Sequence, residues 1–212
     1  MQVLCLPVGM LQANCYIVYE QDGGEAVVID PGAEEERILR RIGEHGLRVR
    51  HVLLTHVHFD HMLASREVME ATGADLLVPA GDAQALNDNQ LNARFLVGPD
   101  TPYPLTASRL LNEGDQVAVG GMRFQVLETP GHTAGGCCYI CEDALFTGDT
   151  LFAGSMGRTD LPGGSVALLR MSLDKLSTLS GEYTVYPGHG ETTTLEKEKQ
   201  SNPFMGENFY NF

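Results

Sequence analysis

The sequence predicts a mixed α/β fold, and two observations carry that prediction. Short runs of β-branched and aromatic residues, typical of strands, alternate along the chain with segments whose apolar residues recur at helical spacing. The chain has 212 residues, of which 43% are hydrophobic, and this is enough for one domain with a sizeable core. We therefore expect a single domain over residues 1–212, in which strands and helices are interleaved.

In the first half of the chain, strands are expected over residues 2–8, 14–20, 25–30, 50–54 and 75–79. A helix is expected over 33–44, ended by Gly46, and a second helix begins at Asp60 and ends at Gly73. Residues 80–110 follow no clear period and contain Pro99, Pro102 and Pro104. This region is therefore predicted to be irregular.

The second half predicts a hairpin whose strands, 117–119 and 124–127, are joined across Gly120-Gly121. The remaining expected elements are strands at 137–141 and 145–149, a helix near 165–179, a strand at 183–187 and a helix near 192–200. Residues 193–204 fit a capping helix followed by a docked aromatic tail better than a ligand-binding element.

The five cysteines are an odd number and do not suggest a disulfide framework. Cys138 and Cys141 have the spacing of a redox or zinc pair. The run 137–141 is nevertheless typical of a strand, which places these two side chains on opposite faces. We expect the cysteines there to pack as small apolar residues.

The net charge of −14 argues against a nucleic-acid partner, whose phosphates need basic patches. The chain has no run of 18 apolar residues, so no membrane partner is expected. Residues 1–4 lack the basic start of a signal peptide, and a cytoplasmic location is the expectation. The sequence gives no indication of the oligomeric state.

Three histidines and an aspartate crowd into the segment THVHFDH at residues 55–61. The four candidate ligands are His56, His58, Asp60 and His61. An apolar run, 51–54, precedes them and predicts a buried strand, so the cluster lies on the turn between a strand and a helix. Histidine is the commonest metal ligand and aspartate adds an anionic oxygen. Coordination uses all four side chains whereas packing needs none of them, and we therefore predict a metal site.

Further candidate ligands follow three later strands. His132 and His189 each stand after a strand and a Pro-Gly turn, and Asp149 ends the strand 145–149. If one edge gathers these strand ends, seven groups meet, which is too many for one tetrahedral ion. Two divalent ions about 3.5–4 Å apart, bridged by a carboxylate and a water, would use them all.

The order of THxHxDH, PGHT, TGDT and PGHG resembles the metallo-β-lactamase fold, and more narrowly its glyoxalase II (hydroxyacylglutathione hydrolase) branch. The resemblance extends over almost the whole chain, from Asn14 to Phe204. It implies a four-layer αββα sandwich, with two mixed sheets packed face to face and helices outside. The chain looks like the short, single-domain members, because it ends soon after His189 and lacks the helical domain that supplies glutathione contacts in longer relatives.

The same resemblance implies how the ligands are shared between the ions. One metal takes His56, His58 and His132, the other takes Asp60, His61 and His189, and Asp149 bridges them. Asp30 matches a family aspartate near the site. From its own sequence context, Asp30 is either a strand-to-turn residue or a partner that holds a ligand histidine.

The activity implied is hydrolysis of a thioester such as S-lactoylglutathione to a hydroxy acid and glutathione, by a hydroxide held between the metals. Asp60 and Asp149 are the candidate catalytic residues, as ligands first, with a secondary proton-transfer role for Asp60. Arg158, in the Gly-rich loop 152–164, is either a solvated side chain or a substrate-binding residue that meets a glutathione carboxylate. Zinc is the expected metal, and iron or manganese also suits these ligands.

Other functions stay open at this point. An iron-dependent persulfide dioxygenase of the same fold would use one iron on His56, His132 and Asp149, and carries a segment like 157–160. A lactonase is a further hydrolytic variant. A structural or sensor domain, which is not an enzyme, would instead close all seven ligands around metal.

Overall fold

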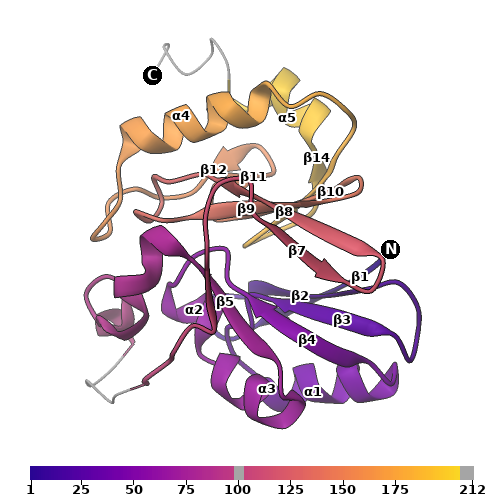
Figure 1. The fold of residues 1–212 in the computed structure, drawn as a ribbon. Helices are drawn as coiled ribbons and strands as arrows, with labels where there is room; N and C mark the ends of the chain where they lie inside the picture. The colour runs from indigo at the N-terminus through magenta and orange to yellow at the C-terminus, as the bar shows by residue number, and fades with distance from the viewer. Residues whose placement is uncertain (98–102, 206–212) are drawn as a thin grey trace.

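The computed structural model describes residues 1–97 and 103–205, which form four layers in the order helices, sheet, sheet, helices (Figure 1). The predicted four-layer α/β architecture is therefore confirmed. The first sheet has the strand order β1-β2-β3-β4-β5-β6. Its strands are β1 (Gln2–Val8), β2 (Ala13–Tyr19), β3 (Glu25–Ile29), β4 (Arg48–Leu53), β5 (Asp75–Pro79) and β6 (Arg109–Leu111). The pairs from β1 to β3 are antiparallel and those from β3 to β6 are parallel, so the sheet is mixed.

The second sheet has the order β14-β13-β10-β9-β8-β7, and only its β10–β13 pair is parallel. Its strands are β7 (Gln116–Val119), β8 (Met122–Glu128), β9 (Cys137–Cys141), β10 (Ala144–Gly148), β13 (Thr184–Pro187) and β14 (Thr193–Thr194). A separate two-stranded ribbon, β11 (Leu151–Phe152) with β12 (Ser155–Met156), follows β10.

Two groups of helices cover the outer faces of the sheets (Figure 1). The first sheet is covered by α1 (Glu35–Glu44) and α3 (Ser65–Thr72), and the second by α4 (Val166–Ser177) and α5 (Leu195–Ser201). The helix α1 turns Ile38 and Ile42 inward, one turn apart, which is the spacing that buries one face of a helix. The hydroxyl of Ser165 accepts a hydrogen bond from the Leu168 amide and so caps the start of α4.

A core of buried side chains lies between the two sheets, where alternate strand residues point inward. Tyr16, Val27 and Leu53 of the first sheet pack there with Phe124 and Phe146 of the second, among other residues. Full burial of one such side chain stabilises the fold by about 1.5–3 kcal/mol. This core fixes the two sheets against each other, and therefore fixes the loops that leave their strands.

The cysteines of β9 follow the predicted alternation. Cys137 and Cys141 face the core between the sheets, whereas Cys138 faces the core beneath α4 and α5. All three thiols are free and buried, and burial raises the pKa of Cys138 and of Cys141 to about 11. These residues are packing groups, as expected.

The prediction of one helix from Asp60 to Gly73 is wrong, because the segment forms α2 (Phe59–Met62) and then α3. The amide of Ala64 donates to Pro31 O at 2.9 Å instead of continuing the first helix. A Cβ on Gly32 would lie 1.5 Å from Asp60 O, so the turn after β3 runs directly against α2. That contact comes from a distant segment and has no local signal.

The region 80–110, predicted to be irregular, contains the 3₁₀ helices η1 (Ala80–Asn87) and η2 (Arg94–Leu96) and the strand β6. Pro99 and Pro102 of this prediction lie outside the described residues. No helix among the described residues has both the length and the apolar character needed to cross a membrane.

Candidate metal centre

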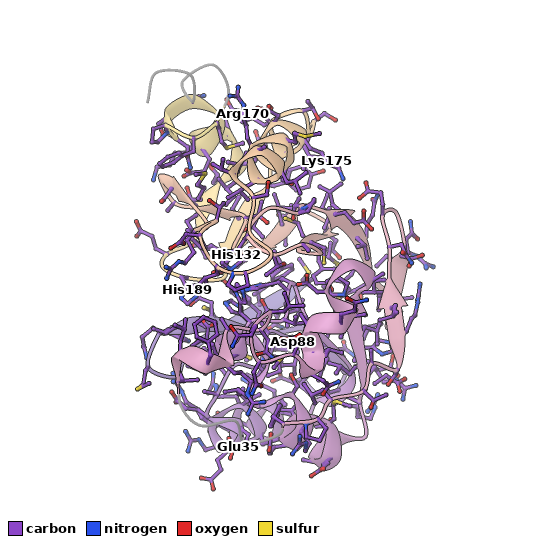
Figure 2. The ribbon with its side chains drawn as sticks, turned by 90° about the vertical axis from the view of Figure 1, so that its left-hand side faces the viewer. Glu35, Asp88, His132, Arg170, Lys175 and His189 are labelled. Carbon is purple, nitrogen blue, oxygen red and sulfur yellow. The ribbon has the colours of Figure 1, made fainter. Side chains whose placement is uncertain are left out.

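The loops that follow β4, β8, β10 and β13 meet at one edge of the two facing sheets. The amide of Cys137 donates to Thr55 O at 2.9 Å and the amide of Gly188 donates to Gly148 O at 2.8 Å, so each loop is tied to a neighbour. Figure 2 shows His132 and His189 where the halves of the molecule meet. The structure brings all seven of the predicted ligand residues to this edge.

Six of the seven residues form two groups whose donor atoms lie within 4.8 Å of one another. We call His56, His58 and His132 the first cluster, and Asp60, His61 and His189 the second cluster. This division is the same as the one that the sequence resemblance implies.

In the first cluster, Nδ1 of His58 lies 2.8 Å from Nε2 of His132. The ring of His56 stands at 85° to that of His58, with the ring centroids 4.9 Å apart. Nδ1 of His56 contacts the Thr55 hydroxyl at 3.1 Å, while its Nε2 is buried and has no hydrogen-bond partner. A buried nitrogen without a partner carries a desolvation cost, which a bound cation would remove.

In the second cluster, Nε2 of His189 lies 3.3 Å from Nε2 of His61 and 3.2 Å from Oδ2 of Asp60. Two donors bound to one tetrahedral zinc at about 2.0–2.1 Å lie roughly 3.3–3.4 Å apart. The spacing of these three residues therefore fits one metal ion.

Asp149 lies between the two clusters. Its Oδ2 is 3.5 Å from Nε2 of His132 in the first cluster and 3.7 Å from Nε2 of His189 in the second. Its Oδ1 is 3.4 Å from Nε2 of His61, and this buried oxygen has no hydrogen-bond partner. A carboxylate in this position can reach ions in both clusters.

The outward-facing nitrogens of three histidines each contact an oxygen of the protein. Nδ1 of His61 lies 3.0 Å from Oδ2 of Asp30, Nδ1 of His132 lies 2.7 Å from Arg158 O, and Nδ1 of His189 lies 3.1 Å from Leu11 O. A hydrogen bond at Nδ1 orients the ring and leaves Nε2 free to act as the ligand.

Asp30 combines both roles that its sequence context allowed. It directly follows β3 and has a φ of 53°, a left-handed conformation that few residues other than glycine adopt. Its carboxylate accepts hydrogen bonds from the Thr55 amide at 2.7 Å and the Thr55 hydroxyl at 2.6 Å, besides contacting His61. Asp30 is close enough to His56 and His61 to form a third possible donor group, but these contacts already occupy its oxygens.

The charges around the two clusters differ. Burial and the neighbouring histidines lower the pKa of His56 well below its usual range, and burial lowers the pKa of His58 to about 3. Burial also disfavours a charged His61, yet Asp60, Asp149 and Asp30 together raise its pKa to about 10. His56 and His58 therefore offer neutral imidazoles in the first cluster, while the carboxylates of Asp60, Asp149 and Asp30 favour a cation at His61 in the second.

A cavity of about 350 Å³ borders the clusters. Its lining includes His58, Asp60, His132, Asp149 and His189, together with the apolar side chains of Phe152 and Met156. Arg158, the predicted substrate-binding residue, also lines this cavity, with its guanidinium paired to the Asp160 carboxylate at 2.7 Å. Most ligand pockets combine apolar walls with a few polar groups in this way.

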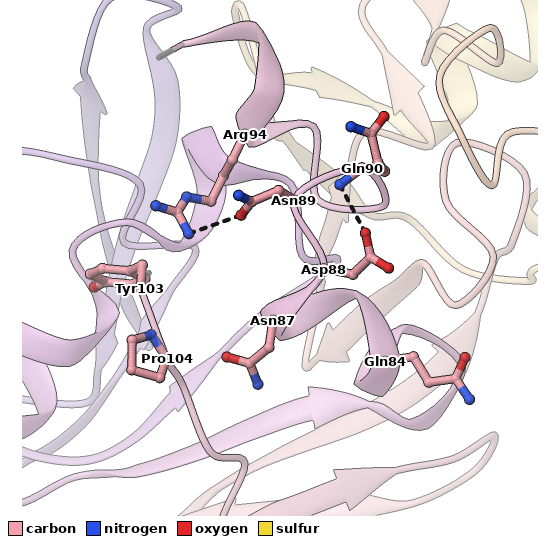
Figure 3. Close-up of a pocket in the computed structure, with 8 residues that line it drawn as sticks. All are labelled: Gln84, Asn87, Asp88, Asn89, Gln90, Arg94, Tyr103 and Pro104. Atoms are coloured by element: carbon pink, nitrogen blue, oxygen red, sulfur yellow. Dashed lines mark hydrogen bonds between the residues drawn. The ribbon is translucent and has the colours of Figure 1, made fainter. Parts of the chain in front are cut away.

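A larger cavity, of about 750 Å³, lies beside η1 and η2 (Figure 3). Most of the described residues that line it have polar side chains, among them Asn87, Asp88 and Arg94, and none of the cluster residues is part of it. Its size does not make it the reaction site, because the convergent donors lie elsewhere.

Three residues that contact the clusters or the loops carrying them were not predicted from the sequence. They are Thr55 beside His56, Asp82 beside Val57, and Leu11, whose carbonyl contacts His189. Thr55 adjoins the ligand motif and could have been suspected from that position. Asp82 and Leu11 are distant in sequence from the ligand motifs. Asp82 accepts a hydrogen bond from a backbone amide and Leu11 contacts His189 through its own backbone carbonyl, so no sequence motif identifies either residue.

The residues fit metal ions on three counts: donor spacing, buried donor atoms without partners, and carboxylates that favour a cation beside His61. With the four-layer fold, this defines the class of protein as an α/β metalloprotein with a His/Asp site at the edge shared by two sheets. A model of the metallo-β-lactamase superfamily matches residues 8–189. The chain belongs to the metallo-β-lactamase superfamily, as a metallo-hydrolase, and the resemblance stated from its sequence is confirmed.

Similar proteins include hydroxyacylglutathione hydrolase GloC of Haemophilus influenzae, which is 34% identical over 209 residues, or 97% of this chain and 98% of the relative. The crystal structure of the BLEG-1 B3 metallo-β-lactamase has a TM-score of 0.87 and 34% identity, with 96% of this chain and 99% of that chain covered. The structure of TTHA1623 in a di-iron-bound form has a TM-score of 0.84 and 39% identity, with 96% and 100% covered.

Removal of metal should destabilise the fold, because ions held by the native clusters would not bind the unfolded chain in the same way. At a free metal concentration about 1,000 times the Kd, binding adds roughly 4 kcal/mol to the free energy of unfolding. For a chain of this size we expect a chelator to lower the Tm by on the order of 10 °C. Thermal melts with and without the chelator, followed by circular dichroism, measure this shift. Equal melting temperatures would contradict metal binding at these residues.

Proposed function

We propose that this metallo-hydrolase cleaves a thioester such as S-lactoylglutathione into a hydroxy acid and glutathione. The observation that carries the proposal is the position of Asp149 between two clusters of three donors, 3.4 Å from His61 and 3.5 Å from His132. The 34% identity to GloC, a hydroxyacylglutathione hydrolase, supports the choice of substrate class.

In this proposal the first cluster would hold one divalent ion, the second cluster would hold another, and the Asp149 carboxylate could reach both. Once bound, such ions would lower the pKa of a bound water and polarise the carbonyl of the substrate. Zinc is the proposed metal. Iron or manganese also suits mixed nitrogen and oxygen donors, and the di-iron form of TTHA1623 supports iron.

The residues of the chain supply position and proton transfer. Asp60 lines the cavity, and although burial disfavours its charge, His61 and His189 hold its pKa well below the usual range. Its carboxylate therefore stays ionised and serves first as a metal ligand, and because a lowered pKa makes a weaker base, proton transfer from the attacking water is a secondary role. The thiolate of a thioester leaves more easily than an alkoxide or an amine, so protonation of the leaving group is less demanding. Among the described residues that line the cavity there is no cysteine, and a cysteine nucleophile is not required.

Arg158 is proposed to bind an anionic group of the substrate. It is the single lysine or arginine among the described residues that line the cavity, and its exposed side chain is held by Asp160. We expect Arg158→Ala to raise KM roughly 10-fold with little change in kcat, because a charge-assisted hydrogen bond to bound substrate would be lost. Asp160→Ala, which frees the same guanidinium, should instead lower KM. Steady-state kinetics of both variants measures these changes in KM. A loss confined to kcat in Arg158→Ala would rule out a substrate-binding role for Arg158.

The persulfide dioxygenase alternative needs one iron, on His56, His132 and Asp149. The second cluster weighs against it, because the nitrogens of His61 and His189 converge at 3.3 Å and are not part of that iron site. The cavity beside the clusters likewise weighs against a closed structural site.

The proposal is tested by incubating the purified, metal-analysed protein with S-lactoylglutathione in the absence of oxygen and following free thiol. We expect rapid thiol release that stops when a chelator is added. No release without oxygen, together with oxygen uptake on a persulfide, would replace the hydrolase by the dioxygenase. If the protein neither releases thiol from S-lactoylglutathione nor takes up oxygen with a persulfide, lactones and other esters are the next substrates to test.

A further inference from the structure

Asp82 is a buried carboxylate that belongs to neither cluster. It lies in η1, directly after β5, and only 2% of its surface is exposed. A buried carboxylate is costly unless donors surround it, so a position of this kind needs a structural or functional reason.

Three donors surround Asp82, and they come from two loops. Its Oδ2 accepts hydrogen bonds from the Val57 amide at 3.2 Å and the Thr133 hydroxyl at 2.8 Å. Its Oδ1 accepts a hydrogen bond from the Gly135 amide at 2.6 Å. Val57 stands between His56 and His58, and Thr133 directly follows His132.

The backbone is shaped to admit this contact. A Cβ on Gly135 would lie 2.2 Å from the Asp82 nitrogen, and a Cβ on Gly81 would lie 2.7 Å from the Gly135 Cα. The start of η1 and the loop after β8 therefore touch through two glycines. Without this approach the Asp82 carboxylate could not reach both loops.

We propose that Asp82 is the positioning residue of the first cluster, holding the His56–His58 loop of the first sheet against the His132 loop of the second. It contacts no ligand side chain and acts through Val57, Thr133 and Gly135. Asp30 differs from Asp82, because it contacts Nδ1 of His61 in the second cluster directly and reaches His56 of the first cluster through the Thr55 hydroxyl. A change at Asp82 should therefore affect the first cluster more than the second. The inference rests on the metal site proposed above.

Asp82→Asn is the most direct variant, because it keeps the size of the side chain. An amide nitrogen replaces one acceptor oxygen and cannot accept the hydrogen bonds that Oδ2 now accepts. Thr133→Val is a milder second variant that removes one donor and leaves those of Val57 and Gly135 in place.

Glu198→Gln is a matched control. Glu198 is fully buried and its carboxylate also accepts three hydrogen bonds, from the Thr193 hydroxyl at 2.6 Å and from Gly154 and Asn202 at 2.8 Å. It therefore experiences the same chemical change as Asp82→Asn without contact to either cluster. Both variants should show a general loss of stability, but only Asp82→Asn should also lose metal affinity.

The measurement is a Co²⁺ titration of the full metal-free chain, followed by visible absorption, with circular dichroism to check folding. Three imidazoles and a site with two imidazoles and a carboxylate give different Co²⁺ spectra, so the clusters can be followed separately. We expect Asp82→Asn to raise the Co²⁺ Kd of the first cluster about 10- to 100-fold and to leave the second within about 2-fold. Thr133→Val should give a smaller increase at the same cluster, and Glu198→Gln none.

Equal Co²⁺ affinities in the parent chain and a folded Asp82→Asn variant would overturn the assignment. The same would hold if Glu198→Gln weakened the first cluster as much, because the effect would then be general destabilisation. If the parent chain itself bound no Co²⁺, the proposed metal site would fail, which is a different outcome from failure of Asp82 alone. Should Asp82→Asn not fold, the comparison of Thr133→Val with Glu198→Gln decides.

Discussion

Asp149→Asn should lose metal and hydrolytic activity together. The carboxylate of Asp149 faces His132 of the first cluster and both His61 and His189 of the second. An asparagine keeps the shape but has no negative charge and only one acceptor oxygen, so it cannot serve two cations. Metal ions contribute several kcal/mol to stabilising the transition state, and each 1.36 kcal/mol is a factor of ten. We therefore expect kcat/KM to fall by about 1,000-fold or more.

Metal content and thiol release are to be measured on the same preparation of Asp149→Asn. Arg158→Ala serves as the comparison, because it should keep both metals and lose only substrate affinity. Normal turnover by Asp149→Asn, or full activity with one ion per chain, would disprove the role of Asp149 between two metals.

Gly188→Ala should damage the site through a single added methyl group. A Cβ at Gly188 would lie 2.1 Å from Oδ1 of Asp149 and 2.8 Å from Cε1 of His61, far inside van der Waals contact. The backbone of Gly188 is not in the left-handed region, so the clash, and not backbone strain, is the expected cause. Since a displacement of 1 Å can cost 10²-fold in rate, we expect kcat to fall about 100-fold, with overpacking of roughly 1–3 kcal/mol.

Gly43→Ala is the matched control for this change. Gly43 lies in α1, and an added Cβ there meets nothing within 4 Å. Alanine is also the better helix former by about 1 kcal/mol, so this variant should be as stable as the parent or more stable. Kinetics and metal content of both variants decide the point, and full activity in Gly188→Ala would show that the Asp149 carboxylate does not occupy this position in the working protein.

The candidate site could be proposed from the sequence because the candidate ligands are concentrated in short motifs. Four of them fall within residues 56–61, and His132 and His189 share the same Pro-Gly-His context after a strand. The strands recognised from their residue pattern end just before each motif. The ends of neighbouring strands lie side by side, so the motifs were expected to meet. The pairing of the two sheets and the division of ligands came from family resemblance, because periodicity alone does not determine how sheets pack.

What the sequence missed depends on contacts between distant segments. The strands β6, β11, β12 and β14 have only two or three residues, which is too short for an alternating pattern. The break between α2 and α3 follows from a hydrogen bond to Pro31. Asp82 lies 51 residues from Thr133 and binds through a side chain that no local pattern distinguishes from a surface acid.

The most direct test of the account is a titration of the metal-free chain with Zn²⁺, and separately with Fe²⁺ or Mn²⁺, in which thiol release from S-lactoylglutathione is recorded at each step without oxygen. We predict that activity rises to its maximum at two ions per chain, since both clusters and Asp149 would then be engaged. Full activity at one ion per chain, or activity that appears only with iron and oxygen, would contradict it.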